Sequence, residues 1–136
     1  MESSGIKSVL RLDKVVFDKI EFKRIGFKSD KEFEFSIESN ISKRDNAEFY
    51  RSTLVLNGCK QGEYEIEISI TGFFFLDHAD ELQQDIKSDL ISKNTVAILM
   101  PYLRSEVTLL TAQPETVPVV LPVFNVRNML KECNKP

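Results

Sequence analysis

The sequence predicts an α+β fold, in which a four-stranded antiparallel meander is followed by a long helix and a short C-terminal helix. Three observations support this. The first half alternates apolar and polar residues, the connections there are short and carry turn residues, and the second half places apolar residues at helical spacing. The 136 residues are about the length of one domain, so we expect a single domain over residues 1–136.

Two strands are predicted by a regular alternation with a period of two residues. Over residues 32–41, Phe33, Phe35 and Ile37 alternate with polar and acidic residues. Over residues 64–70, a tyrosine and three isoleucines lie opposite acidic residues and a serine. Each pattern is typical of a strand with one buried face and one exposed face.

Two further strands are expected over about residues 14–23 and 48–56. In the first, the alternation slips by one residue near Asp18, which indicates a β-bulge. Residues 28–31, 43–46 and 57–58 carry the turn signals between strands. Short turns favour antiparallel neighbours, because parallel strands need long crossover connections.

The second half predicts helices. Residues 77–93 are polar and form either a short helix or an ordered loop, and Asn94 is a candidate cap for a helix over about 95–111. Pro101 lies inside that helix and should kink it. The apolar positions at helical spacing are Val96, Leu99, Met100, Leu103, Val107 and Leu110. Prolines then bracket a short apolar extended segment over 119–123, and residues 125–132 predict the last helix.

Bulk properties exclude several classes of protein. The hydrophobic share is 42%, the charged share 29% and the net charge −3, which is typical of a globular protein and argues against nucleic-acid binding. No apolar stretch is long enough to span a membrane, and the first residues do not resemble a signal peptide. Cys59 and Cys133 form no C-x-x-C pair, so we expect reduced thiols and a cytoplasmic protein.

No catalytic motif is present in the sequence. The single histidine, His78, follows Asp77 in a polar stretch that lacks recognised metal-ligand spacing, and a turn is the simpler interpretation. The sequence has no G-x-S-x-G, P-loop or G-x-G-x-x-G. Arg104, inside an apolar helix, is expected to pair with a carboxylate or a carbonyl. We therefore expect no enzymatic activity, no metal and no cofactor.

The C-terminal third resembles the SecB family of protein-export chaperones. Residues 98–104, ILMPYLR, resemble the I-L-F-P-Y-A-R segment of that family. Residues 118–125, PVVLPVFN, are similar to its proline-flanked apolar segment, and residues 70–74, ITGFF, to the end of its last strand. The resemblance covers about residues 12–132, which is the ordered core we expect.

The resemblance implies a sheet backed by helices and a homotetramer, built as a dimer of dimers and packed partly through the long helix. Leu99, Leu103, Val107 and Leu110 are then the expected interface residues. The implied function is that of an ATP-independent holdase, which keeps unfolded polypeptides or preproteins unaggregated for export or delivery.

Particular residues follow from the same resemblance. The client-binding candidates are Phe33, Phe35, Ile37, Phe124, Met129 and Leu130. Glu63, Glu65 and Glu67 form an expected acidic surface, either for docking a SecA-type translocase motor or as a solvated strand face.

Two departures from the family weaken the export role. The connection near residues 27–31 is shorter than the family's crossover loop, and the chain ends at Pro136 without the family's tail. A SecB-like chaperone dedicated to the antitoxin of a toxin-antitoxin system is therefore the alternative. A module for one specific partner or apolar ligand is the other.

Overall fold

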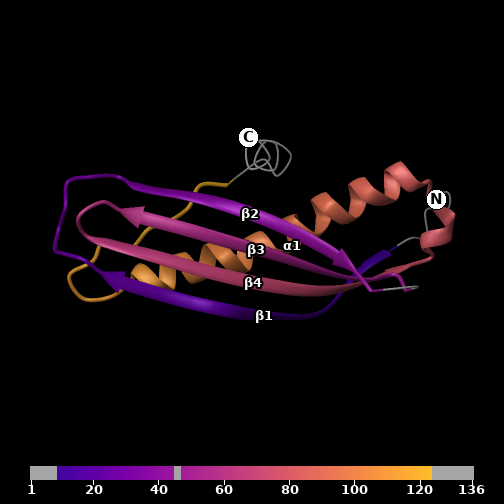
Figure 1. Cartoon of the computed structure of the whole chain (residues 1–136), viewed down its shortest axis with the longest axis horizontal. Helices are drawn as coiled ribbons and strands as arrows, with labels where there is room; N and C mark the ends of the chain where they lie inside the picture. Colours follow the sequence, from indigo (N-terminus) through magenta and orange to yellow (C-terminus); the bar gives the residue numbers. More distant parts are fainter. Residues whose placement is uncertain (1–8, 45–46, 124–136) are drawn as a thin grey trace, which may run out of the picture.

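Four strands form one antiparallel sheet, and a long helix lies along one of its faces (Figure 1). The structure is a computed structural model that describes residues 9–44 and 47–123. Its elements are β1 (Val9–Arg24), β2 (Phe33–Lys43), β3 (Phe49–Lys60), β4 (Tyr64–Asp77), a 3-10 turn (Ala79–Glu81) and α1 (Gln84–Thr111). The predicted α+β class, with four antiparallel strands and a long helix, is confirmed.

The strand order is β1-β4-β3-β2, which corrects the predicted meander. The chain from β2 through β3 to β4 is a meander, but β1 pairs with β4 and not with β2. Residues 25–32 therefore connect the two edges of the sheet, and we call them the crossover. Neighbouring strands are about 4.8 Å apart, so three spacings are about 14 Å, a distance that a short segment can span.

Strand β1 follows β4 with two register shifts, between Leu12 and Lys14 and between Phe17 and Lys19. The second confirms the bulge predicted near Asp18. Its carboxylate accepts a hydrogen bond from Thr71 Oγ1, which lies 2.9 Å from Thr53 Oγ1. The bulge thus links β1 to both central strands on the face away from α1.

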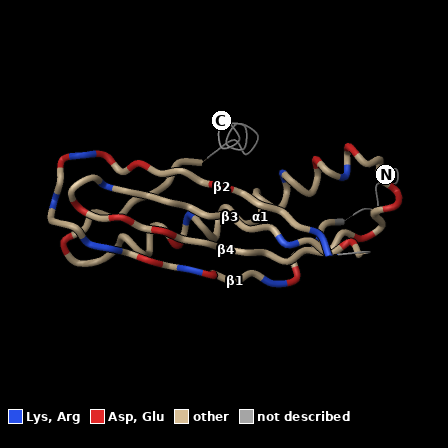
Figure 2. Tube along the Cα trace, viewed as in Figure 1, with Lys and Arg blue, Asp and Glu red and all other residues tan. Residues whose placement is uncertain are grey.

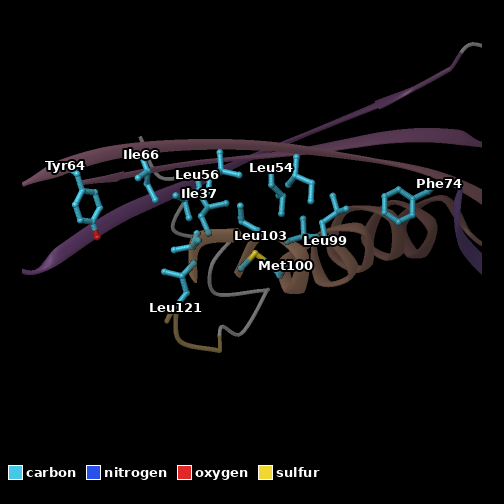
Figure 3. Packing of buried hydrophobic residues seen from close by; sticks show 14 residues of the cluster. Ile37, Leu54, Leu56, Tyr64, Ile66, Phe74, Leu99, Met100, Leu103 and Leu121 are labelled. Atoms are coloured by element: carbon cyan, nitrogen blue, oxygen red, sulfur yellow. The ribbon is translucent and has the colours of Figure 1, made fainter. Parts of the chain in front are cut away.

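The core lies between the sheet and α1 (Figure 3). Its fully buried members include Leu54, Leu56, Ile68, Ile70 and Phe74 from the sheet, and Val96, Leu99, Leu103 and Val107 from the helix. The last three were predicted to lie between protomers, and this is corrected because they are already covered by the chain's own sheet. Leu110 is partly buried and also packs against this core.

Helix α1 begins at Gln84, eleven residues before the predicted start at 95, so Asn94 lies within the helix and caps nothing. The extra turns are held by Leu90 and Ile91, which pack with Tyr50 and Leu76 in a second apolar cluster. The helix continues through Pro101, which is exposed. No helix of the described ranges is long and apolar enough to cross a membrane. The predicted final helix, 125–132, lies outside the described residues.

Candidate functional site

Four aromatic rings form a row on the helix side of the sheet, at the end where the crossover lies. Phe22 stacks on Tyr64 with ring centroids 4.9 Å apart, Tyr64 lies 6.2 Å from Phe33, and Phe33 lies 6.0 Å from Phe35. The rings come from β1, β4 and β2. Tyr64 is buried, but the three phenylalanines are partly exposed. We call these residues the aromatic row.

Gly58 on β3 makes room for the row. A Cβ at this position would lie 2.4 Å from Phe33 Cζ, closer than two carbon atoms can approach without a shift. Residue 58 is the β3 partner of Phe35 and lies beneath the ring of Phe33. A glycine here therefore allows the edge strand to lay its phenylalanine over the neighbouring strand.

Residues 112–123, which we call the connector, follow α1 and are held to it by hydrogen bonds between helix side chains and the main chain of the connector. Thr108 Oγ1 donates to the carbonyl of Val119 at 2.8 Å, and the Val119 N–H donates to Thr111 Oγ1 at 2.8 Å. Arg104 Nη2 donates to the carbonyl of Leu121 at 3.2 Å, so Arg104 does pair with a carbonyl as predicted. Leu121 itself is buried in the core.

The outward side chains of the connector are apolar. Val117, Val120 and Val123 are 71%, 74% and 82% exposed, and Phe27 of the crossover is 72% exposed. With Ile25, these are five of the ten exposed large apolar side chains among the described residues. Such a concentration on one part of a surface is typical of an interaction site.

Polar contacts bring the crossover and the connector together (Figure 1, left). Lys28 Nζ lies 3.7 Å from Glu115 Oε1, and Arg24 donates a hydrogen bond to Thr116 Oγ1. These contacts place Val117 beside the crossover at one end of the molecule, and Val120 and Val123 follow where the connector runs back along α1. We call Ile25, Phe27, Phe33, Phe35, Val117, Val120 and Val123 the apolar surface.

Glu63 holds the crossover through a hydrogen bond to its main chain. Its predicted place on an acidic surface is corrected, because its side chain is buried. It is only 1% exposed, and its carboxylate accepts hydrogen bonds from the Ser29 N–H at 3.0 Å and from Lys60 Nζ at 3.0 Å. Burial alone would raise the pKa of Glu63, but these donors outweigh it and hold the pKa below its ordinary value. Glu63 precedes β4, so the strand's alternation does not extend to it.

Glu65 and Glu67 do lie on the face away from α1. Glu65 is exposed, and Glu67 forms an ion pair with Lys19 at 2.9 Å. With Glu21 and Glu34 they line an open depression of about 430 Å³, which Lys23 also lines. Two lysines therefore moderate the negative charge of this region, and its role in docking a motor stays a prediction.

The structure separates the predicted client-binding residues. Phe33 and Phe35 lie in the aromatic row. Ile37 is 3% exposed and belongs to the core, which corrects its prediction as an accessible contact. Phe124, Met129 and Leu130 lie outside the described residues.

Sequence reasoning missed Ile25, Phe27 and the outward valines as exposed site residues. The usable signals were an apolar pair around Gly26, between charged residues, and the proline-bracketed run of valines.

The polar turn after β4 places His78 beside an acidic side chain. His78 Nδ1 lies 3.5 Å from Glu81 Oε2 in the 3-10 turn, and His78 adopts a left-handed backbone with φ 58°. In the part of the chain that the structure describes, no group of three or more His, Cys, Asp or Glu side chains could hold a metal ion.

No protein-family model and no curated protein matches the sequence. A SecB-like chaperone of Mycobacterium tuberculosis, solved in complex with a ChAD peptide from the HigA1 antitoxin, superposes with a TM-score of 0.70. The match covers 85% of this chain and 91% of that one, at 11% identity. This chain has the SecB-like fold.

A second solved structure is also similar. It is a protein of unknown function from Streptococcus agalactiae, with a TM-score of 0.50 and 15% identity, covering 85% of this chain and 98% of that one. Both likenesses concern the fold alone.

Proposed function

We propose that this chain is an ATP-independent holdase that binds unfolded segments of other polypeptides on the apolar surface. The observation that carries the proposal is the concentration of exposed Phe27, Val117, Val120 and Val123 beside the aromatic row. Burial of apolar area contributes about 25 cal/mol per Å² and requires no particular sequence in the bound segment. A surface of this kind binds many extended chains, as a holdase must.

The likeness to a SecB-like chaperone bound to an antitoxin peptide supports polypeptide binding, and it favours an antitoxin segment as the client. An antitoxin segment is the second candidate function, namely a chaperone dedicated to one client. Delivery to a SecA-type motor is a further possibility within the holdase proposal, and Glu65 and Glu67 are its candidate contacts. Either role fits a cytoplasmic protein.

The proposed homotetramer uses the outer side of α1. Leu99, Leu103 and Val107 are buried by the sheet, whereas Tyr102 and Leu109 are exposed on the same helix. Ser105 is exposed between them, and Pro101 is exposed just before Tyr102. An apolar helix face open to water is normally covered by another surface. Tyr102→Lys with Leu109→Lys should lower the mass measured by light scattering, and an unchanged mass would place the interface elsewhere.

The test is suppression of aggregation. A chemically unfolded, slow-folding protein is diluted with or without this chain, in the absence of ATP, and the native form of that protein serves as the binding control. We expect suppression at near-equal stoichiometry and no binding to the native form. Val120→Asp should weaken suppression, whereas Ile86→Asp, at an exposed position of α1, should not.

The two candidate functions differ in selectivity. Suppression across unrelated clients supports the general holdase. Suppression of one antitoxin alone supports the dedicated chaperone. No suppression of any client, or equal loss in both variants, contradicts the proposal and leaves a module for one specific partner or apolar ligand as the leading hypothesis.

A further inference from the structure

The face of the sheet away from α1 carries a second aromatic cluster. Phe49 on β3 lies 6.1 Å from Phe73 and 4.6 Å from Phe75, both on β4, measured between ring centroids. All three are partly exposed. Phe74, between the last two, points into the core between the sheet and α1 (Figure 3). The three rings therefore lie on the open face, and not in the core.

Cations lie over these rings. The guanidinium of Arg11 is 5.3 Å from the centroid of Phe75, Lys14 Nζ is 5.2 Å from that of Phe73, and the guanidinium of Arg44 is 4.7 Å from that of Phe49. Arg51 is the β3 partner of Phe73 and adds a fourth cation on the same face. We call these four cations and three phenylalanines the cationic aromatic patch.

Most of this positive charge is not neutralised within the described chain. Arg11 pairs with Asp77, but Lys14, Arg44 and Arg51 form no ion pair with another described residue. A cation–π contact orients a cation and keeps its charge. The patch thus presents positioned donors beside apolar rings.

The patch differs from the rest of the same face. Toward the crossover, that face carries Glu21, Glu34, Glu65 and Glu67 around the depression already described. Figure 2 shows acidic residues on β4 toward that end and basic residues at the opposite end of the sheet. The chain as a whole has a net charge of −3, so the cationic end is a local feature and not an average property.

We propose that the cationic aromatic patch is a docking surface for an acidic polypeptide segment that carries apolar side chains between its carboxylates. Arginine donates paired hydrogen bonds to a carboxylate, and the partly exposed rings of Phe49, Phe73 and Phe75 offer apolar contact between the cations. Charge complementarity selects the partner, and the rings add the apolar contact.

A nucleic acid fits the patch less well. Bases stack on open ring faces, and here Arg11, Lys14 and Arg44 already occupy positions over the rings. The proposal does not rest on the proposed holdase function, because that function uses the apolar surface on the other side of the sheet.

The experiment compares two charge-reversal variants of the full chain. Arg44→Glu with Arg51→Glu reverses the patch. Lys23→Glu with Lys31→Glu makes the same change in net charge at exposed positions away from it. The probes are a short fluorescent peptide rich in Glu and Leu, the same peptide with Gln in place of every Glu, and a short single-stranded RNA. Binding is measured by anisotropy at low and high salt.

We expect the patch variant to bind the acidic peptide about tenfold more weakly than the control variant, and rising salt to weaken binding to the unmodified chain. The Gln peptide should not distinguish the variants, and Val120→Asp should retain affinity for the acidic peptide. Equal affinity of both variants, or tighter binding of the RNA, overturns the proposal. Thermal unfolding verifies folding, and Arg44→Gln with Arg51→Gln serves if the reversal variant does not fold.

Discussion

Two regions of one sheet face, the central strands and the edge strand β2, have the same alternating pattern and different cover. Leu54 and Leu56 of β3 are fully buried beneath α1, whereas Phe33 and Phe35 of β2 are partly exposed although they point to the same side. Alternation therefore fixes the side to which a residue points. The position of the helix and the connector decides whether water reaches it.

The difference suits a division of roles. The central strands supply stability through contacts with Leu99, Leu103 and Val107. The edge strand and the connector present apolar area that the chain does not bury for itself. Changes in the two regions should therefore differ in their effects on stability and on binding.

The largest expected effect on stability is that of Leu103→Ala. Leu103 is fully buried in the core, so truncation should lower the free energy of unfolding by about 2–5 kcal/mol. Phe35→Ala, on the partly exposed edge, should lower it by about 1–2 kcal/mol, because less area leaves water on folding. Urea unfolding measures both. Equal losses would erase the distinction between centre and edge.

Glu63→Gln tests the anchor of the crossover. It should lower the free energy of unfolding by about 1–3 kcal/mol at neutral pH, because buried donors lose a charged acceptor. Glu65→Gln, at an exposed position, is the control.

The same variant should change the dependence of stability on pH. The folded pKa of Glu63 lies below its unfolded value of about 4.3, so its contribution is complete above the unfolded pKa and is lost as pH falls through the folded pKa. The difference between the unmodified chain and Glu63→Gln should therefore shrink as pH falls below about 4. A constant difference would show that the charge of Glu63 contributes nothing.

Gly58→Ala tests how closely the aromatic row packs on β3. The added methyl meets the ring of Phe33, so the free energy of unfolding should fall by about 1 kcal/mol and the ring should move. Phe33→Ala in the same chain should remove most of that loss. A double-mutant cycle measures this coupling, and additive losses would mean that the ring does not lie over residue 58.

The smallest effect is expected at the outward side of the connector. Val120→Ser should change the free energy of unfolding by less than about 0.5 kcal/mol, because this side chain is exposed. Its neighbour Leu121 is buried, and Leu121→Ser should cost several-fold more. Similar losses at the two positions would show that the connector does not hold this alternation in solution.

The local pattern was enough to predict the strand over 64–70 and the bulge at Asp18. Strand geometry alone requires side chains to alternate with a period of two residues, and a bulge shifts that alternation by one residue. It failed where distant contacts decide. The early start of α1 depends on contacts of Leu90 and Ile91 with Tyr50, which is far away in the sequence. The pairing of β1 with β4 depends on the crossover, residues 25–32, whose sequence resembles that of a turn between neighbouring strands.

The candidate site was predictable only in part. Phe33 and Phe35 follow from alternation, but the burial of Ile37 and Glu63 does not, because each depends on segments far away in the sequence. The exposure of Val120 depends on which residues of the connector make contact with α1. No periodicity within the connector reveals that.

The course of the connector depends on main-chain groups. Thr108, Thr111 and Arg104 bind the backbone of Val119 and Leu121, and they make no demand on the side chains at 117, 120 and 123. Those three positions can therefore vary in size, shape or charge with little effect on the path of the chain. Substitutions at these positions could therefore change which segments the proposed binding surface accepts while the fold stays the same.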